Sequence, residues 1–298
     1  MKKNIIVVTG GAGFVGSNLI EEIIKKKKFK IISIDNYSSG SKKNHIKDKN
    51  IKYIKSHTKE IEKILKIYRK KIQCIFHFGE FARIYQSFLN FNECFYSNSI
   101  GTKAVFKFCL ENKIKLIYSA TSASLGNSGK DKNLSPYAFT KAKNLELLEN
   151  LKTWFGFKYE VIYFYNVYGP RQICKGKMAT VIGIFESQML NQKPLTIVKP
   201  GTQTRRFTHI SDTIKVCIEA WKKNKNLHYS IASKETYSLI QVAKKFGGKI
   251  KYLPKRPGER YASALTKMNL SNIVNKRFGT VKLCNYIKEF RAKHHFTK

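Results

Sequence analysis

The sequence predicts an α/β protein with a doubly wound parallel sheet and a smaller substrate lobe towards the C-terminus. Short apolar runs alternate with longer segments whose apolar residues recur at helical spacing, which is typical of βαβ units. The first apolar run also ends in a glycine-rich turn that opens a helix, TGGAGFVG at residues 9–16. We expect residues 1–170 to form the sheet domain. Residues 171–298 should be mainly the lobe, partly interleaved with that domain.

The elements of the sheet domain follow one another in a regular order. Short apolar or β-branched runs predict buried strands, and apolar residues at a spacing of three to four predict helices. We expect strands at residues 4–10, 29–36, 51–56, 74–79, 114–120 and 158–169, and helices at 17–27, 60–70, 97–113 and 135–155. After about residue 170 the pattern is less regular. It predicts a helix at 178–192, a short strand at 194–198 and a basic turn at 199–206.

Composition excludes several classes of protein. The six cysteines form no C-x-x-C pair or His/Cys cluster, so we expect neither a metal site nor a disulfide framework. Free thiols favour the cytoplasm. The apolar runs are too short for a signal peptide or a membrane span, so we expect no membrane association.

The net charge of +38 is compatible with nucleic-acid binding. Lysine runs such as KKKKFK at 25–30 are spread along the chain, however, without the interleaved aromatic residues of an RNA-binding signature. We therefore favour lysines on solvated faces and expect no nucleic-acid partner. The charge would still attract a small polyanionic substrate.

The glycine-rich turn has the spacing of a dinucleotide-binding loop. Gly10 permits a tight turn, Gly13 lets the backbone approach a pyrophosphate, and Gly16 lets helix and strand pack closely. The N–H groups and dipole of the following helix favour phosphate. Asp35 ends the second strand, where a carboxylate would accept the ribose hydroxyls of NAD and repel the 2′-phosphate of NADP. A Rossmann-type fold that binds NAD is the resulting prediction.

Nine segments, in this order, resemble the extended short-chain dehydrogenase/reductases, specifically the nucleotide-sugar epimerases and dehydratases of the UDP-glucose 4-epimerase type. They are TGGAGFVG, DNYSSG, FHFGEFARIYQS, NSIGT, YSATSASLG, SPYAFTKA, YNVYGPRQ, PGTQTRRFTHISD and RPGE. The resemblance covers nearly the whole chain. It implies an NAD-dependent enzyme that acts on a nucleotide-diphosphate sugar, and commonly a homodimer formed by pairing two long helices, here 98–113 and 136–155.

The resemblance assigns Tyr137 of the Y-x-x-x-K motif to proton transfer, with Lys141 and Thr121 as its catalytic partners. Tyr137 and Lys141 share a helix face, so the ammonium group, together with the positive nicotinamide ring, should lower the pKa of the phenol. Lys141 should also hold the nicotinamide ribose. We expect Thr121 to hydrogen-bond the sugar hydroxyl.

The resemblance also implies two sets of binding residues. The substrate-binding residues are Thr121, Asn166, Arg205 and Arg256, of which the two arginines should clamp the diphosphate. The cofactor-binding residues are Gly10, Gly13, Phe14, Val15, Gly16, Asp35, Asn36, Ser39, Gly40, His57, Thr58, Phe78, Gly79, Glu80, Asn98, Tyr137 and Lys141.

The chain departs from the family pattern at several positions. Ser56-His57 replaces the usual Gly-Asp, Gly79-Glu80 replaces Ala-Ala, and Arg206 stands where an Asp is usual. Family dehydratases carry Asp-Glu after the catalytic Thr, where this chain has Ser122 and Ala123. Because dehydration needs an acid and a base, we expect epimerisation at C4 through a 4-keto sugar.

Three alternatives remain open. The enzyme could be a C4 dehydrogenase that releases the keto sugar, or a 4,6-dehydratase with its acid and base elsewhere. A non-catalytic NAD-binding regulator or anion-binding module would have no use for Tyr137, Lys141 and Thr121 together.

Overall fold

The computed structural model describes residues 3–124, 131–223, 226–259 and 279–296. Within these residues the central sheet has seven parallel strands in the order β11-β6-β5-β4-β1-β2-β3. This order confirms the predicted Rossmann-type fold class. The strands are β1 (Ile5–Thr9), β2 (Lys30–Asp35), β3 (Ile51–Lys55), β4 (Ile72–His77), β5 (Lys115–Thr121), β6 (Tyr159–Phe164) and β11 (His228–Ile231).

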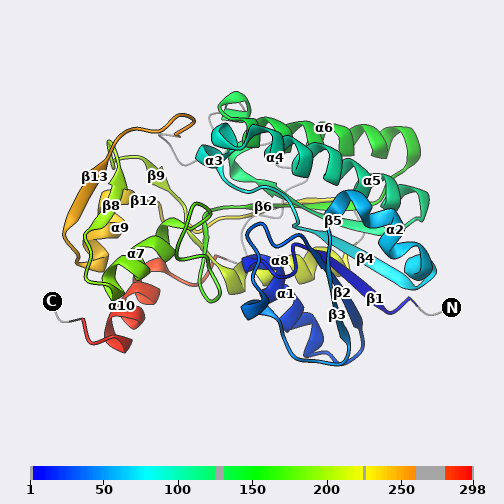
Figure 1. The fold of residues 1–298 in the computed structure, drawn as a ribbon, viewed down its shortest axis with the longest axis horizontal. Helices are drawn as coiled ribbons and strands as arrows, with labels where there is room; N and C mark the ends of the chain where they lie inside the picture. The colour runs from blue at the N-terminus through cyan, green and yellow to red at the C-terminus, as the bar shows by residue number, and fades with distance from the viewer. Residues whose placement is uncertain (1–2, 125–130, 224–225, 260–278, 297–298) are drawn as a thin grey trace.

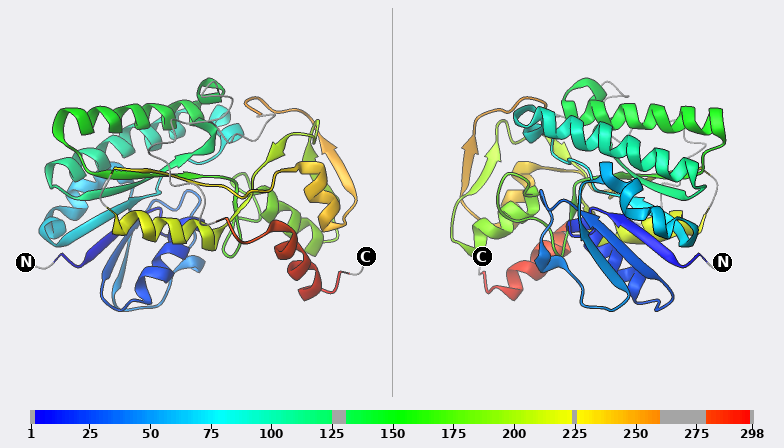
Figure 2. Two further views of the ribbon diagram at one scale, coloured as in Figure 1. Left: turned by 180° about the vertical axis from the view of Figure 1, so that it is seen from behind. Right: turned by 45° about the vertical axis from the view of Figure 1, so that its right-hand side comes forward.

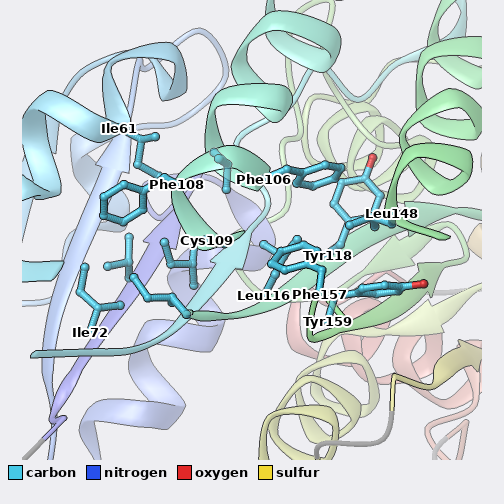
Figure 3. Close-up of a cluster of buried hydrophobic side chains, with 14 of the residues drawn as sticks. Ile61, Ile72, Phe106, Phe108, Cys109, Leu116, Tyr118, Leu148, Phe157 and Tyr159 are labelled. Carbon is cyan, nitrogen blue, oxygen red and sulfur yellow. The ribbon is translucent and has the colours of Figure 1, made fainter. Parts of the chain in front are cut away.

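Helices cover both faces of this sheet (Figure 1). In β1, Ile5 and Val7 pack into one apolar cluster and Ile6 and Val8 into another, because successive side chains of a strand point to opposite faces. The first cluster, shown in Figure 3, lies under α2 (Ile61–Leu65), α5 (Thr102–Glu111) and α6 (Pro136–Phe155). The second lies under α1 (Phe14–Ile24) and α8 (Ile210–Lys222).

Two predicted helices have different limits in the structure. The segment expected at 60–70 forms α2 only to Leu65 and continues as a 3-10 helix, Lys66–Lys71, which buries no side chain. Only Tyr68 of this segment packs partly against the core, which gives little tertiary support to an α-helix there. The helix expected at 97–113 begins earlier: α4 (Phe91–Phe95) leads through a π-helical segment, Tyr96–Gly101, into α5. The short α3 (Ile84–Leu89) precedes it.

The second lobe is built around its own apolar cluster, which includes Phe185 and Phe246. A parallel pair, β8 (Leu195–Val198) and β13 (Ile250–Leu253), packs with α7 (Val181–Leu190), α9 (Leu239–Phe246) and α10 (Leu283–Lys293). Two small sheets join β7 (Val167–Tyr168) to β10 (Thr208–His209), and β9 (Thr204–Arg205) to β12 (Tyr237–Ser238).

The chain crosses between the two parts more than once, as the two views of Figure 2 show. After entering the lobe it returns to the central sheet with α8 and β11, and then goes back to the lobe with α9. No helix within the described ranges is long and apolar enough to span a bilayer.

Candidate active site

A cavity of about 490 Å³ lies at the carboxyl ends of the central strands and extends to the second lobe. Its wall includes residues that end or follow β1, β2, β4 and β5, together with Thr196 and Leu253 of the lobe. The strand order reverses between β1 and β4, and parallel α/β sheets bind their ligands at such a switch point. Most of the residues expected at the site line this one cavity.

The glycine-rich turn forms a cradle that a side chain would fill. Gly10 has φ +71°, and a Cβ there would lie 2.8 Å from the backbone of Phe78. A Cβ on Gly16 would collide with the carbonyl of Gly10. No side chain caps the start of α1, and its first turn has no acidic residue. The N-terminus of α1 is therefore suited to the diphosphate of NAD. Gly10, Gly13, Phe14, Val15 and Gly16 all line the cavity.

Asp35 lies beside this cradle with a carboxylate held in one orientation. Its oxygens accept hydrogen bonds from the backbone N–H groups of Ala12 at 2.9 Å and Tyr37 at 2.8 Å. Burial raises the pKa of this carboxyl, although these hydrogen bonds act to lower it. Asn36 and Ser39 line the same part of the cavity, but Gly40 does not. A Cβ at Gly40 would lie 2.9 Å from the Asp35 oxygens, so this glycine lets the loop pass Asp35.

His57 and Thr58 form the far wall of the same region. The His57 Nδ1 atom accepts a hydrogen bond from the Lys59 N–H, and its ring lies 4.7 Å from that of Tyr96 between centroids. The Thr58 hydroxyl is buried and has no hydrogen-bond partner in the protein. Its oxygen lies against Gly101, where a Cβ would be 2.3 Å away.

The three expected catalytic residues come from two elements. Ser135 caps α6 by accepting from the Ala138 N–H at 3.1 Å, and Pro136 occupies its first turn. Tyr137 and Lys141 follow one turn apart. Thr121 is the last residue of β5. All three line the cavity. The Tyr137 and Thr121 side chains share a hydrogen bond.

The charge around Tyr137 differs from the expectation. Burial raises the pKa of Tyr137 to about 12, despite the Thr121 hydrogen bond, and the negative charge of Glu80 acts in the same direction as burial. Lys141 donates to Glu80 and, at 2.6 Å, to the Ser119 carbonyl. The pKa of Tyr137 is therefore raised in the protein without NAD, and its lowering by Lys141 together with the nicotinamide ring stays a prediction. Glu80 offsets the charge of Lys141, and the phenol is desolvated.

Asn98 is the second expected cofactor-binding residue that does not line the cavity. Its side chain is fully buried: the carbonyl oxygen accepts from the Phe81 N–H at 2.7 Å, and the amide nitrogen donates to the Phe81 carbonyl and to Thr140. The structure places Asn98 as a brace between the loop after β4 and α6. Phe78, Gly79 and Glu80, in that loop, do line the cavity.

The lobe end of the cavity carries the expected substrate-binding residues Asn166, Arg205 and Arg256. Arg205 donates to Glu259 at 2.6 Å, and the Arg256 guanidinium lies 4.8 Å from the centre of the Tyr85 ring. Glu259 also lines the cavity and was not among the expected site residues. It belongs to the RPGE segment, which is the signal that could have identified it.

Arg83 is a further cavity residue that the sequence reasoning missed. Its guanidinium donates twice to the Met178 carbonyl, from Nε at 3.0 Å and Nη2 at 2.6 Å. The positive charge of Arg83 acts to lower the pKa of Tyr137. A lone arginine in the mostly apolar stretch FARIY was the available signal. Among the residues with described positions, no cluster of His, Cys, Asp or Glu could hold a metal ion.

Known proteins resemble this chain in both sequence and fold. A UDP-glucose epimerase of Bacillus subtilis, described as uncharacterized, is 32% identical over an alignment of 229 residues that covers 70% of each chain. The UDP-glucose 4-epimerase of Thermotoga maritima, solved with UDP-glucose, is 26% identical with a TM-score of 0.84, covering 98% of this chain and 99% of that one. A UDP-N-acetylglucosamine 4-epimerase of Methanobrevibacter ruminantium, solved with UDP-N-acetylmuramic acid, is 27% identical with a TM-score of 0.83, covering 98% and 97%.

The family model described as the NAD dependent epimerase/dehydratase family matches residues 6–232, most of the chain. This range includes the glycine cradle, Asp35, Thr121, Tyr137 and Lys141. The cradle and the Asp35 carboxylate fit NAD. This chain belongs to the NAD-dependent nucleotide-sugar epimerase/dehydratase family.

Proposed function

We propose that the protein epimerises a nucleotide-diphosphate sugar at C4, with Tyr137 as the proton-transfer residue. One observation carries this proposal: Thr121, Tyr137 and Lys141 line the same cavity as the NAD cradle and the lobe arginines. Bound NAD would supply a reversible hydride acceptor. Gly10, Gly13, Gly16 and Asp35 would hold it, and Arg205 and Arg256 would bind the sugar's diphosphate.

The protein's own residues would move one proton twice. Tyr137 would take the proton of the C4 hydroxyl as the sugar becomes a 4-keto sugar. Thr121 would orient the phenol oxygen of Tyr137 and the C4 oxygen of the sugar. When the keto sugar has presented its other face, Tyr137 would return the proton to the same oxygen. The resulting sugar is inverted at C4 and has unchanged mass. General acid–base catalysis of this kind contributes about a hundredfold to ten-thousandfold in rate.

The acidic residues of the cavity favour epimerisation over dehydration. Among the described residues, the carboxylates that line the cavity are Asp35, Glu80 and Glu259. Asp35 lies beside the cradle, Glu80 binds Lys141, and Glu259 binds Arg205. Next to Thr121, the short 3-10 helix Ser122–Ser124 carries no carboxylate. A dehydratase needs an acid and a base beside the sugar.

The test is NMR of UDP-, GDP- and dTDP-sugars incubated with the purified protein and NAD. We expect inversion at C4 without loss of mass and without accumulation of NADH. A keto product with NADH would instead indicate a C4 dehydrogenase, and loss of water a dehydratase. No reaction with any sugar, from protein that binds NAD, would favour a non-catalytic regulator.

We also propose a homodimer formed through α4, α5 and α6. Large apolar side chains on or next to these helices and the π-helical segment between α4 and α5 are exposed to solvent: Leu89, Phe91, Ile100, Phe139, Trp154 and Phe155. The three helices lie side by side on one face of the sheet (Figure 1). Exposed apolar side chains on neighbouring helices are what an interface between subunits would cover. Size-exclusion chromatography with light scattering should give twice the chain mass, and a monomer at micromolar concentration would refute the dimer.

We place the protein in the cytoplasm. All six cysteines are unpaired, and thiols persist in a reducing compartment. Fractionation of the source cells with an antibody against this chain should find it with cytoplasmic markers. Recovery with secreted proteins would contradict this location.

A further inference from the structure

Glu80 is a buried acid in the catalytic end of the cavity, at a position where the family usually has alanine. Its side chain is 2% exposed. The Lys141 ammonium donates to one of its oxygens. The other oxygen accepts from the Thr102 hydroxyl at 3.0 Å, the Tyr118 hydroxyl at 3.1 Å and the Asn144 amide at 3.3 Å. Four donors surround the carboxyl group, and they favour the ionised carboxylate, because that form can only accept hydrogen bonds. Burial raises the pKa of Glu80, whereas Lys141, Thr102 and Tyr118 act to lower it.

The donors of Glu80 are themselves held in place. Because the Thr102 hydroxyl donates to Glu80, its oxygen is left to accept from His77 Nε2, which lies 2.9 Å away. His77 Nδ1 must then accept from the Thr9 hydroxyl at 2.7 Å. Burial lowers the pKa of His77, which keeps the ring neutral, as this arrangement requires. A chain of hydrogen bonds thus connects the end of β1, beside the NAD cradle, to Glu80.

Lys141 has no freedom to move away from this carboxylate. Two of its three N–H groups go to Glu80 and to the Ser119 carbonyl, and the ammonium lies 4.8 Å from the centre of the Tyr118 ring. Only 4% of the Lys141 side chain is exposed. One N–H remains for a ligand in the cavity that Lys141 lines. A single buried acid therefore sets both the position and the net charge of the group next to Tyr137.

We propose that Glu80 is a positioning residue that acts through Lys141: it fixes the ammonium group and offsets its charge, and so sets the pH at which Tyr137 can act as a base. This inference rests on the proposed role of Tyr137. An active site with a neutral residue at position 80 would leave the lysine charge uncompensated. Its tyrosine would form the phenolate at lower pH.

Other titratable groups face Tyr137 and Glu80 from the neighbouring elements. Tyr118 comes from β5, Cys94 from α4 and Arg83 from the loop before α3. Burial raises the pKa values of Tyr118 and Cys94, so both are uncharged at neutral pH. Arg83 stays charged and is half-buried. Glu80 is then the only anion that these contacts bring to Tyr137 among the described residues.

The test compares Glu80→Gln with the wild-type holoenzyme. Glutamine keeps an oxygen for Thr102, Tyr118 and Asn144 but removes the charge. The acid limb of the kcat/KM profile should move to lower pH by about one unit. At a fixed pH on that limb, kcat/KM as a fraction of each enzyme's own maximum should then be about tenfold higher in Glu80→Gln. An acid limb at the wild-type pH, or at higher pH, would overturn the proposal.

A second readout does not depend on turnover. In protein labelled with ¹³C at the tyrosine rings, with the Tyr137 signal assigned through Tyr137→Phe, the tyrosinate shift should appear at lower pH in Glu80→Gln. An unchanged titration would show that Glu80 does not control Tyr137, even if no substrate were turned over. If the wild-type protein showed no activity on any nucleotide sugar, that result would count against the proposed function and not against the role of Glu80.

Two further variants separate charge from structure. Glu160→Gln removes another fully buried glutamate, which pairs with Lys115 at 3.8 Å outside the cavity, and should leave both titrations unchanged. Glu80→Ala removes the same charge and leaves room for water, so it should shift the acid limb in the same direction as Glu80→Gln. It carries the test if the glutamine variant does not fold. If the acid limb moved as far in Glu160→Gln as in Glu80→Gln, the movement would reflect a general change in stability and would overturn a specific role for Glu80.

Discussion

At the catalytic end of the cavity, Lys141 and Glu80 expose 4% and 2% of their side chains, whereas Arg205 and Glu259 at the lobe end expose 15% and 21%. Both are pairs of opposite charge. The first is surrounded by further hydrogen-bond donors and acceptors, so a change in its charge cannot be screened by water. The second is partly hydrated, and Arg205 can share its donors between Glu259 and a phosphate. Proton transfer by Tyr137 requires charged groups that are held in place, whereas binding of a diphosphate requires a charged group that is accessible from the cavity.

The largest effect should come from Tyr137, at the catalytic end. Tyr137→Phe removes the hydroxyl that would take the proton, so turnover should fall by about a hundredfold to ten-thousandfold. The ring remains, so the affinity for NAD should change little. Stopped-flow kinetics and fluorescence titration with NAD would measure the two quantities. Turnover near the wild-type rate would remove Tyr137 from the mechanism.

At the lobe end, Arg205→Met should raise KM for the nucleotide sugar by about tenfold to a hundredfold, because a charged hydrogen bond to phosphate is lost. The value of kcat should change little, since the group acts on substrate and transition state alike. Arg206→Met is the matched control. Arg206 does not line the cavity and donates to the Ser233 and Lys234 carbonyls, so its loss should lower thermal stability and leave KM unchanged. Equal effects of the two variants on KM would contradict a specific role for Arg205.

The next prediction concerns Asp35, a buried carboxylate beside the NAD cradle. Asp35→Ala should weaken NAD binding by about tenfold, because the ribose hydroxyls lose a charged acceptor. The ratio of the affinity for NAD to that for NADP should also fall, because the carboxylate no longer repels the 2′-phosphate. Calorimetry with both cofactors would measure the ratio. Asp48→Ala, at an exposed position in the same region, should leave the ratio unchanged. A preserved preference for NAD in Asp35→Ala would assign that choice to other residues.

The smallest effect should be at Arg83, whose charge acts on Tyr137 in the opposite direction to that of Glu80. Removing a nearby cation raises the pKa of a phenol, so Arg83→Met should move the acid limb to higher pH by less than about one unit, since Arg83 is half-buried and screened. Arg83→Lys keeps the charge and should lie closer to the wild type. A shift of Arg83→Met to lower pH would show that its contact with Met178 matters more than its charge.

Parts of the site that depend on local sequence were predictable. The glycine spacing, the strand before it and the helix after it predict the cradle, because turn, cap and dipole are properties of neighbouring residues. Ser135 and Pro136 likewise predict the start of α6 and hence the shared face of Tyr137 and Lys141. The doubly wound parallel sheet, though not its strand order, was predicted from the alternation of strands and helices together with this loop.

Other features depend on contacts between distant segments. The return of α8 and β11 to the central sheet was not predicted, because their apolar residues fit a lobe as well as a sheet. Asn98 was expected at the cofactor, but its partners Phe81 and Thr140 are 17 and 42 residues away. Gly40 was assigned to the cofactor, but it does not line the cavity, and a Cβ there would lie 2.9 Å from the Asp35 oxygens.

By itself, the sequence determined the fold class, the NAD loop and the residue types needed for proton transfer, since each depends on short spacings and backbone chemistry. Tertiary structure alone decided the charge of the catalytic centre. Glu80 was an unexplained substitution in the sequence. Only the packing of β5, α5 and α6 brings Tyr118, Thr102 and Lys141 around it. Burial then makes that one carboxylate control its neighbours, because a charge in a low-dielectric interior is not screened by water.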